Sequence, residues 1–267
     1  MSDGEAGPAE GRITSERKGR VLTIGIDRPR KLNGFSPKML VELAEAFTSL
    51  ERDEAAWVGV LYAHGANFTA GLELDKVAPI MRERGGVFPP GTIDPLSLRS
   101  PIRSKPLVCA VQGICFTLGI ELMLAADIVV AADDCRFAQI EIARGIMPAG
   151  GATVRMVERA GWGNAQRYLL TADEFGAGEA LRLGLVQEVV PTGRQKDRAM
   201  EIAGVVAEQA PLAVRASLAS SRTAIERGPE AAFGELKAQQ AQLMATADAA
   251  EGVRSFIERR RARFTGQ

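Results

Sequence analysis

Hydrophobic positions along this chain follow the pattern of strands and then that of helices, in repeated alternation. Continuous apolar runs at residues 21–27, 57–63 and 107–112 predict buried strands. After the first run, Ser36 and Pro37 supply an N-cap and a first-turn proline, and apolar residues then recur at helical spacing. The pattern therefore predicts an α/β protein whose buried strands are separated by helices.

The alternation of strands and helices continues to about residue 192. From residue 194 onward the pattern is helical throughout, and Pro211 and Pro229 mark two helix starts. The first residues, MSDGEAGPAEG, are small, acidic and proline-bearing, which predicts a disordered tail. We therefore divide the chain into a tail, an α/β core and a C-terminal helical region, at residues 1–18, 19–195 and 196–267.

Residues 85–106 interrupt this alternation with a long segment rich in turn signals. The segment carries Gly-Gly, Pro-Pro-Gly and Asp-Pro, so we expect a loop with several turns. Loops of this length in compact domains are often lids or binding loops. A mobile surface excursion is the alternative, and the pattern alone does not separate the two.

Composition and charge exclude several classes of protein. Lys+Arg and Asp+Glu balance at 33 each, which gives no global argument for binding nucleic acid or an anionic membrane. The basic run at residues 258–263 is a local exception, and such runs are usually solvated faces. The apolar stretch at residues 106–120 is too short to span a bilayer. Cysteines without CxxC spacing indicate reduced thiols in a cytoplasmic protein.

One heptapeptide pattern occurs twice, as FTAGLEL at residues 68–74 and FTLGIEL at residues 116–122. Each copy follows a buried strand and precedes helical sequence, and its threonine, Thr69 or Thr117, is placed to cap that helix. The first N–H groups of a helix point outward at the positive end of its dipole. The glycine in each copy allows another group to approach the backbone closely. Two such turns facing each other would form an oxyanion hole from main-chain donors alone.

Glutamates in apolar surroundings are the candidates for acid–base chemistry. Glu121 lies in ICFTLGIELMLAA, and burial there raises a carboxyl pKa unless the group is paired. Glu141 lies in FAQIEIARGIMPAGG, so the two carboxyls could divide the roles of acid and base. The structural alternatives are a buried arginine partner for Glu121, and Arg144 or Arg155 as the partner of Glu141. Glu73, which precedes a polar stretch, is expected to be exposed or to interact locally.

These motifs together resemble the enoyl-CoA hydratase/isomerase (crotonase) superfamily, and the resemblance covers nearly the whole chain after about residue 18. It implies a crotonase-like spiral of ββα repeats with a C-terminal helical region that forms trimers, often paired into hexamers. The echoed heptapeptides would be equivalent turns of successive spiral units. The segments that carry the resemblance are IDRPRKLNGFS (26–36), NFTAGLEL (67–74), KPLVCAVQGICFTLGIELMLAADIVVA (105–131), FAQIEIARGIMPAGG (137–151), LTADEFGAGEALRLGLVQEVVP (170–191) and SFIERRRARF (255–264).

The resemblance implies an enoyl-CoA hydratase, a hydro-lyase that adds water to a (2E)-enoyl-CoA thioester. The thioester oxygen would lie between the backbone N–H groups of Ala70 and Leu118. Glu121 would activate water as the general base, and Glu141 would deliver a proton to C2. Neither a metal nor a cofactor is implied, because CoA is part of the substrate.

Further positions are implied to bind the substrate and its CoA portion. Phe256 and Arg259 would contact CoA from a neighbouring subunit of the trimer or dimer of trimers. Val87, Phe88, Leu96 and Leu98 in the long loop are expected to line the acyl tunnel. The remaining positions implied to contact substrate or CoA are Arg28, Lys31, Leu32, Gly71, Leu72, Glu73 and Gly119.

Some residues depart from the family pattern. Thr117 and Leu118, with Gly119, stand where family hydratases usually have three glycines, so Leu118 adds bulk beside the thioester. Ala149 stands where dienoyl-CoA isomerases have aspartate, which argues against that activity. His64 is expected to be structural. The alternatives to hydration are another crotonase reaction such as enoyl-CoA isomerisation, and a non-catalytic acyl-CoA- or RNA-binding scaffold.

Overall fold

A six-stranded, mostly parallel sheet forms the centre of the protein in the computed structural model, which describes residues 10–267. Only β1 runs antiparallel to its neighbour. Every residue of β3 and β4 is buried, as expected for parallel strands covered on both faces. The strands, in the order in which they lie, are β1 (Arg12–Lys18), β2 (Val21–Asp27), β3 (Val58–Ala63), β4 (Leu107–Val111), β6 (Ile128–Ala132) and β9 (Glu188–Val190).

Helices cover this sheet on both faces. The amphipathic helix α1 (Pro37–Arg52) begins at the N-cap Ser36, whose hydroxyl accepts from the N–H of Met39, as its sequence predicts. On the other face, α7 (Gln195–Ala207) buries alanines against β3, β4 and β6. Its alanines let the helix approach the sheet closely, so α7 belongs to the core. The predicted boundary between residues 195 and 196 is therefore wrong.

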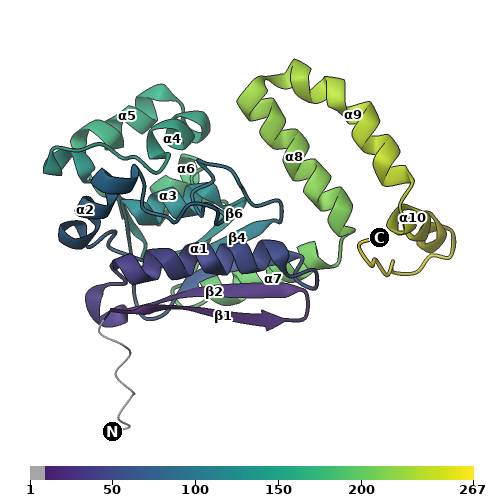
Figure 1. Cartoon of the computed structure of the whole chain (residues 1–267), viewed down its shortest axis with the longest axis horizontal. Helices are drawn as coiled ribbons and strands as arrows, with labels where there is room; N and C mark the ends of the chain where they lie inside the picture. Colours follow the sequence, from purple (N-terminus) through teal and green to yellow (C-terminus); the bar gives the residue numbers. More distant parts are fainter. Residues whose placement is uncertain (1–9) are drawn as a thin grey trace, which may run out of the picture.

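A second, smaller layer lies beside one end of the main sheet. It pairs three short strands and carries the helices that follow them in sequence. Its strands are β5 (Ile114–Phe116), β7 (Arg136–Ala138) and β8 (Phe175–Gly176). Its helices are α3 (Leu118–Ala125), α4 (Ala152–Ala160), α5 (Trp162–Thr171) and α6 (Ala177–Arg182), and α2 (Leu74–Arg84) lies nearby (Figure 1). Short 3-10 helices occupy Pro29–Lys31 and Glu141–Arg144.

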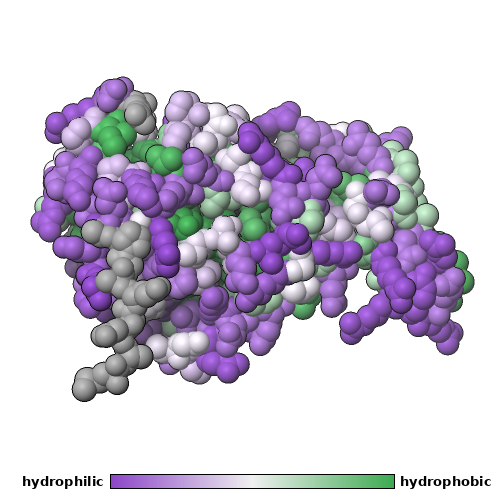
Figure 2. Space-filling model, turned by 60° about the horizontal axis from the view of Figure 1, so that its bottom comes forward, coloured by the Kyte–Doolittle hydropathy of each residue, from purple (hydrophilic) through white to green (hydrophobic). Residues whose placement is uncertain are grey.

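The last three helices project from this core (Figure 1). They are α8 (Pro211–Arg227), α9 (Pro229–Met244) and α10 (Ala247–Ile257), and the two prolines begin their helices as predicted. None of the α8 residues is buried. Figure 2 shows hydrophobic groups among the hydrophilic surface, and Phe233 and Phe256 are 69% and 85% exposed. The projecting region thus begins at Pro211 and leaves apolar side chains uncovered within this chain.

The N-terminal prediction is wrong in part. Residues 12–18 were assigned to a disordered tail, but they form β1, which pairs along its whole length with β2. Residues 1–9 lie outside the described residues. Alternation of apolar residues is weak in β1 because this edge strand is largely exposed. Within residues 10–267, no helix is long and apolar enough to cross a membrane.

Candidate active site

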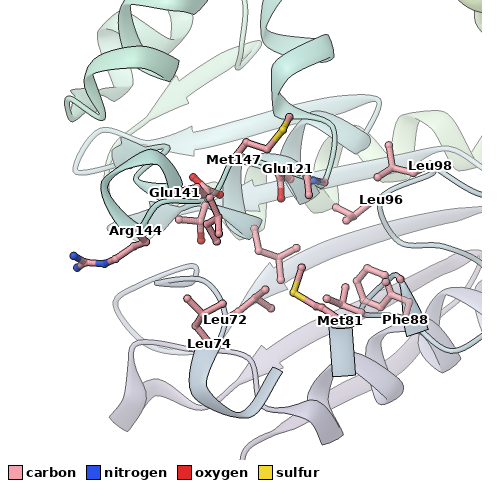
Figure 3. A pocket seen from close by; sticks show the side chains of 18 of the residues that line it. Leu72, Leu74, Met81, Phe88, Leu96, Leu98, Glu121, Glu141, Arg144 and Met147 are labelled. Atoms are coloured by element: carbon pink, nitrogen blue, oxygen red, sulfur yellow. Dashed lines mark hydrogen bonds between the residues drawn. The ribbon is translucent and has the colours of Figure 1, made fainter. Parts of the chain in front are cut away.

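A cavity of about 330 Å³ opens between the smaller layer, α2 and the long loop. Its walls are mostly apolar, and all four loop residues predicted to line an acyl tunnel contribute to it: Val87, Phe88, Leu96 and Leu98. Figure 3 shows Glu121 and Glu141 on one wall, with Leu72, Leu74, Met81 and Phe88 across the space. The loop at residues 85–106 therefore forms part of the cavity wall, as expected of a binding loop.

The first copy of the repeated turn is hydrogen-bonded to the segment before α1, at residues 32–35. The N–H of Ala70 donates to the carbonyl oxygen of Leu32 at 2.9 Å. Ala70 is therefore engaged within the protein, and the prediction that its N–H is an oxyanion donor is wrong. Leu72 forms a parallel bridge with Phe35. The N–H of Phe35 donates to the carbonyl oxygen of Gly71, and its carbonyl oxygen accepts from the N–H of Glu73. The N–H of Leu72 consequently points away from Phe35 and has no acceptor within residues 10–267.

The second copy turns into a helix much earlier. Thr117 is the N-cap of α3, so Leu118 occupies the first helical position and its N–H has no acceptor among the described residues. Leu118 also lines the cavity. The N–H of Thr117 donates to the carbonyl oxygen of Ala138 at 2.9 Å, which fixes the turn against the smaller sheet. Leu72 and Leu118 thus each supply one unpaired main-chain donor at the cavity, one from each turn.

The two turns are packed directly against each other. A Cβ at Gly71 would collide with the hydroxyl of Thr117, and Gly71 has a φ of +103° that only glycine adopts easily. Gly119 faces Thr69, where an added Cβ would lie 2.8 Å from the Thr69 Cγ2. Gly119 is therefore a packing residue and does not line the cavity, contrary to the prediction. Thr69 caps no helix, because its hydroxyl donates to Asn33 and accepts from Gly71.

Glu121 is buried, with 5% of its surface exposed. Its Oε1 accepts from the N–H of Gly150 at 2.5 Å. Burial raises the pKa of Glu121, while the N–H groups of Gly150 and Ala152 and the charge of Arg155 oppose the rise. Within residues 10–267 Glu121 forms no ion pair, so the predicted alternative of a buried arginine partner is wrong.

Glu141 begins the 3-10 helix at the cavity wall and has a different environment. Burial raises the pKa of Glu141 to about 7, and the charge of Glu121 adds to that rise. The buried Gln139 amide, with its nitrogen turned toward Glu141, donates to Oε2 at 3.0 Å. Arg144 points away from the cavity in Figure 3 and does not pair with Glu141. The two glutamates are therefore close neighbours with different proton affinities.

Arg155 connects the acyl-binding loop to the turn that holds Glu121. Its guanidinium donates to the carbonyl oxygen of Leu96 at 2.7 Å and reaches that of Gly150 at 3.5 Å. A Cβ at Gly150 would collide with the Glu121 carboxylate, so the turn depends on a glycine there. The sequence analysis did not identify Gly150 or Gln139 as site residues. Gly150 contacts Glu121, which is distant along the chain, and no motif in the sequence assigns Gln139 a contact with Glu141.

The predicted CoA-binding residues fall into two groups. Arg28 is buried and pairs with Glu73 at 3.0 Å, so both hold the loop before α1 against the first turn. Glu73 also pairs with Lys76, which confirms that it interacts locally. Lys31 and Leu32 are exposed beside that turn.

Positions at the chain's other end do not reach this cavity. Phe256 belongs to α10 and Arg259 follows it, in the region that projects from the core (Figure 1). His64, the histidine expected to be structural, contacts the hydroxyls of Thr14 and Tyr62 and does not line the cavity.

Residues 10–267 hold no group of three or more His, Cys, Asp or Glu side chains arranged to bind a metal ion.

Known proteins resemble this chain over nearly its whole length. Residues 16–267 match the family described as Enoyl-CoA hydratase/isomerase. Enoyl-CoA hydratase EchA19 of Mycobacterium tuberculosis is 32% identical over 99% of this chain and 99% of that protein. The 2,3-dehydroadipyl-CoA hydratase of Escherichia coli is 30% identical over 94% of this chain and 97% of its own length. A probable enoyl-CoA hydratase/isomerase from Mycobacterium abscessus superimposes with a TM-score of 0.92 at 47% identity, covering 96% of this chain and 98% of that one.

Proposed function

Because the chain belongs to the enoyl-CoA hydratase/isomerase family and has the crotonase fold, we propose that it hydrates (2E)-enoyl-CoA thioesters to 3-hydroxyacyl-CoA. The observation that carries the proposal is the pair of glutamates at one cavity that also presents two unpaired main-chain donors. Apolar walls around them suit a hydrocarbon acyl chain.

The thioester oxygen lies between the N–H groups of Leu72 and Leu118 in this proposal. Attack of water at C3 pushes electrons through the double bond, so negative charge accumulates on that oxygen. Donors that are already oriented and shielded from water stabilise this charge more than they stabilise the ground state. The resulting polarisation makes C3 electrophilic enough to react.

Glu121 takes a proton from water while its oxygen attacks C3, and Glu141 gives a proton to C2. The roles follow from their surroundings. Burial raises the pKa of both carboxyls, but at Glu121 donation from Gly150 and the charge of Arg155 oppose the rise, whereas Glu141 has a pKa of about 7 and keeps a proton in a large fraction of molecules at neutral pH. One proton enters the substrate and one leaves the water, so the addition is balanced.

The CoA portion extends from this cavity past Lys31 and Leu32, which are exposed beside the first turn. In this proposal Phe256 and Arg259 complete the CoA site from a neighbouring copy. The helix α10, which holds Phe256, belongs to the region that projects from the core (Figure 1). The exposed apolar side chains of α8, α9 and α10 support a homotrimer or a dimer of trimers.

Hydration of crotonyl-CoA and longer 2-enoyl-CoA thioesters, followed by the loss of absorbance of the conjugated thioester, tests the proposal. We expect turnover by the wild type and a large loss in Glu121→Gln and Glu141→Gln. Undiminished turnover in both variants would overturn the assignment of roles. Turnover of 3-enoyl-CoA without any of 2-enoyl-CoA would instead identify an isomerase.

A further inference from the structure

Thr117 has a backbone conformation that threonine rarely adopts. Its φ is +50° and its ψ is −114°, a combination that glycine tolerates and that is strained for a β-branched residue. Such strain persists only where the surrounding structure enforces it, and it is concentrated at functional sites. Here the N–H of Thr117 is held by the carbonyl oxygen of Ala138, and its own carbonyl oxygen accepts from Glu121. Both sides of the residue are therefore fixed.

The hydroxyl of Thr117 is directed at the place where the two turns meet. It is the first atom that a Cβ at Gly71 would strike, ahead of the Thr117 Cβ and Cγ2. Gly71 directly precedes the N–H of Leu72, and Thr117 directly precedes the N–H of Leu118. Thr117 also lines the cavity. Its hydroxyl thus lies against the residue that precedes one free donor, and Thr117 itself precedes the other.

That hydroxyl has no hydrogen-bond partner among residues 10–267, and it caps no N–H of α3. A threonine at an N-cap ordinarily uses its oxygen for this purpose. Neither helix capping nor a bond to the rest of the protein therefore accounts for the hydroxyl. A glycine would adopt the same backbone without strain.

We propose that Thr117 is a third, side-chain donor to the thioester oxygen, beside the main-chain N–H groups of Leu72 and Leu118. The proposal rests on the hydration reaction proposed above. The hydroxyl donates a hydrogen bond that strengthens as negative charge accumulates on the oxygen, and no covalent bond of Thr117 forms or breaks. The strained backbone is what directs the hydroxyl at that oxygen.

Three substitutions separate the hydroxyl from the shape and the strain of the residue. Thr117→Val keeps the branched shape without the donor, Thr117→Ser keeps the donor, and Thr117→Gly removes both the donor and the strain. We expect kcat/KM on a 2-enoyl-CoA to fall about 10- to 100-fold in Thr117→Val and to stay within about threefold in Thr117→Ser, since loss of one oxyanion donor has effects of about that order or larger. Thr117→Gly should melt at a higher temperature than the wild type and still be slower.

Absorbance of bound cinnamoyl-CoA gives a readout that a structural role would not change. Hydrogen bonds to the thioester oxygen polarise the conjugated system and shift its absorbance to longer wavelength. We expect the full shift in the wild type and Thr117→Ser, and a smaller shift in Thr117→Val and Thr117→Gly. Equal shifts and equal kcat/KM in wild type and Thr117→Val would overturn the proposal.

The two proposals fail in distinguishable ways. If the wild type hydrates no 2-enoyl-CoA but the shift of bound cinnamoyl-CoA still depends on the Thr117 hydroxyl, the reaction is wrong and the donor is right. If the wild type hydrates its substrate and Thr117→Gly is as fast and more stable, the reaction is right and Thr117 is only a strained remnant.

Discussion

Residues 68–74 and 116–122 differ only at their third and fifth positions, yet they fold differently. In the first segment no helix forms before Leu74, where α2 begins, and Leu72 makes a bridge with Phe35. In the second, α3 begins at Leu118. The residue with positive φ is Gly71 in the first segment and Thr117 in the second.

Neighbouring segments produce this difference. In the first copy, main-chain groups form hydrogen bonds with the backbone of Leu32 and Phe35, as in a short parallel strand pair. The second is bound by Ala138 of the smaller sheet, one residue before its helix. The two free donors therefore occupy different positions in the repeat, Leu72 at the fifth and Leu118 at the third.

Glutamates at the same position of the two copies have pKa values shifted in opposite directions. Glu73 loses some solvation, but hydrogen bonds from Lys76 and Arg28 outweigh that loss and lower its pKa. For Glu121 burial outweighs the donors, and its pKa is raised. The same position of nearly the same heptapeptide thus holds one structural carboxylate and one candidate base.

The largest difference between the two turns should appear when Glu121 and Glu73 are each replaced by glutamine. We expect Glu121→Gln to lower kcat by ~10²–10⁴-fold, which is the usual contribution of a general base, while Glu73→Gln leaves kcat within a few-fold. Steady-state kinetics on crotonyl-CoA measures both. Comparable losses in the two variants would mean that the repeat position, and not the environment, decides the role.

Gly71→Ala should cause the next largest effect, because the added methyl collides with the Thr117 hydroxyl at a φ that alanine avoids. We expect a loss of ~1–3 kcal/mol in the free energy of unfolding and a fall in kcat, since the N–H of Leu72 moves. Urea unfolding of Gly71→Ala, with Thr117→Gly in the same background, tests the contact. The second substitution should restore part of the lost stability, and simple additivity of the two would contradict the contact.

The pH dependence of kcat and of stability should distinguish Glu141 from the other glutamates. Hydration needs Glu141 protonated, so we expect kcat to fall as pH rises above about 7, following its pKa. Stability should fall in the same direction. The unfolded chain loses this proton near the ordinary value of 4.5 and the folded chain keeps it to about 7, so the folded state binds more protons in that range.

Glu141→Gln is the variant that checks this sign. It should raise the melting temperature more at pH 8 than at pH 5, because the burial penalty of the ionised carboxylate is present only at the higher pH. Thermal melts of wild type and variant at the two pH values supply the measurement. A gain that is equal at both would show that Glu141 carries no raised pKa.

Arg155→Met should have a smaller, selective effect. The substitution removes the hydrogen bond to Leu96 in the acyl-binding loop and a favourable charge near Glu121. We expect KM for long-chain 2-enoyl-CoA to rise about tenfold, as for a lost hydrogen bond from a charged group, with less change for crotonyl-CoA. The acid limb of the kcat profile should also move to higher pH. A uniform loss over all chain lengths would exclude the link to the loop.

Local signals were sufficient for much of the fold. Ser36, Pro37 and the apolar periodicity after them predicted α1, and the run at 21–27 matches β2, since each depends on neighbours along the chain. The docking of α7 was missed because its buried face is made of alanines, which give a weak apolar pattern. The donor Leu72 was missed because Leu32 and Phe35, far along the sequence, determine which N–H groups of the first turn stay free.

Glu73→Gln should produce the smallest effect, and on stability instead of catalysis. The pair with the buried Arg28 fixes the loop before α1 to the first turn, so its loss should lower the free energy of unfolding by about 1 kcal/mol. A carboxylate with a lowered folded pKa stabilises the fold above its unfolded pKa and ceases to do so as pH falls through the folded value. The difference in unfolding free energy between wild type and variant should therefore vanish at low pH.

Urea titrations at pH 7 and at pH 3 measure this difference, with Glu121→Gln as the control. That control should not lose stability at pH 7 in the same way, because removing a buried charge with a raised pKa relieves a penalty. If both glutamines destabilise alike at pH 7, the two carboxyls do not have pKa values shifted in opposite directions.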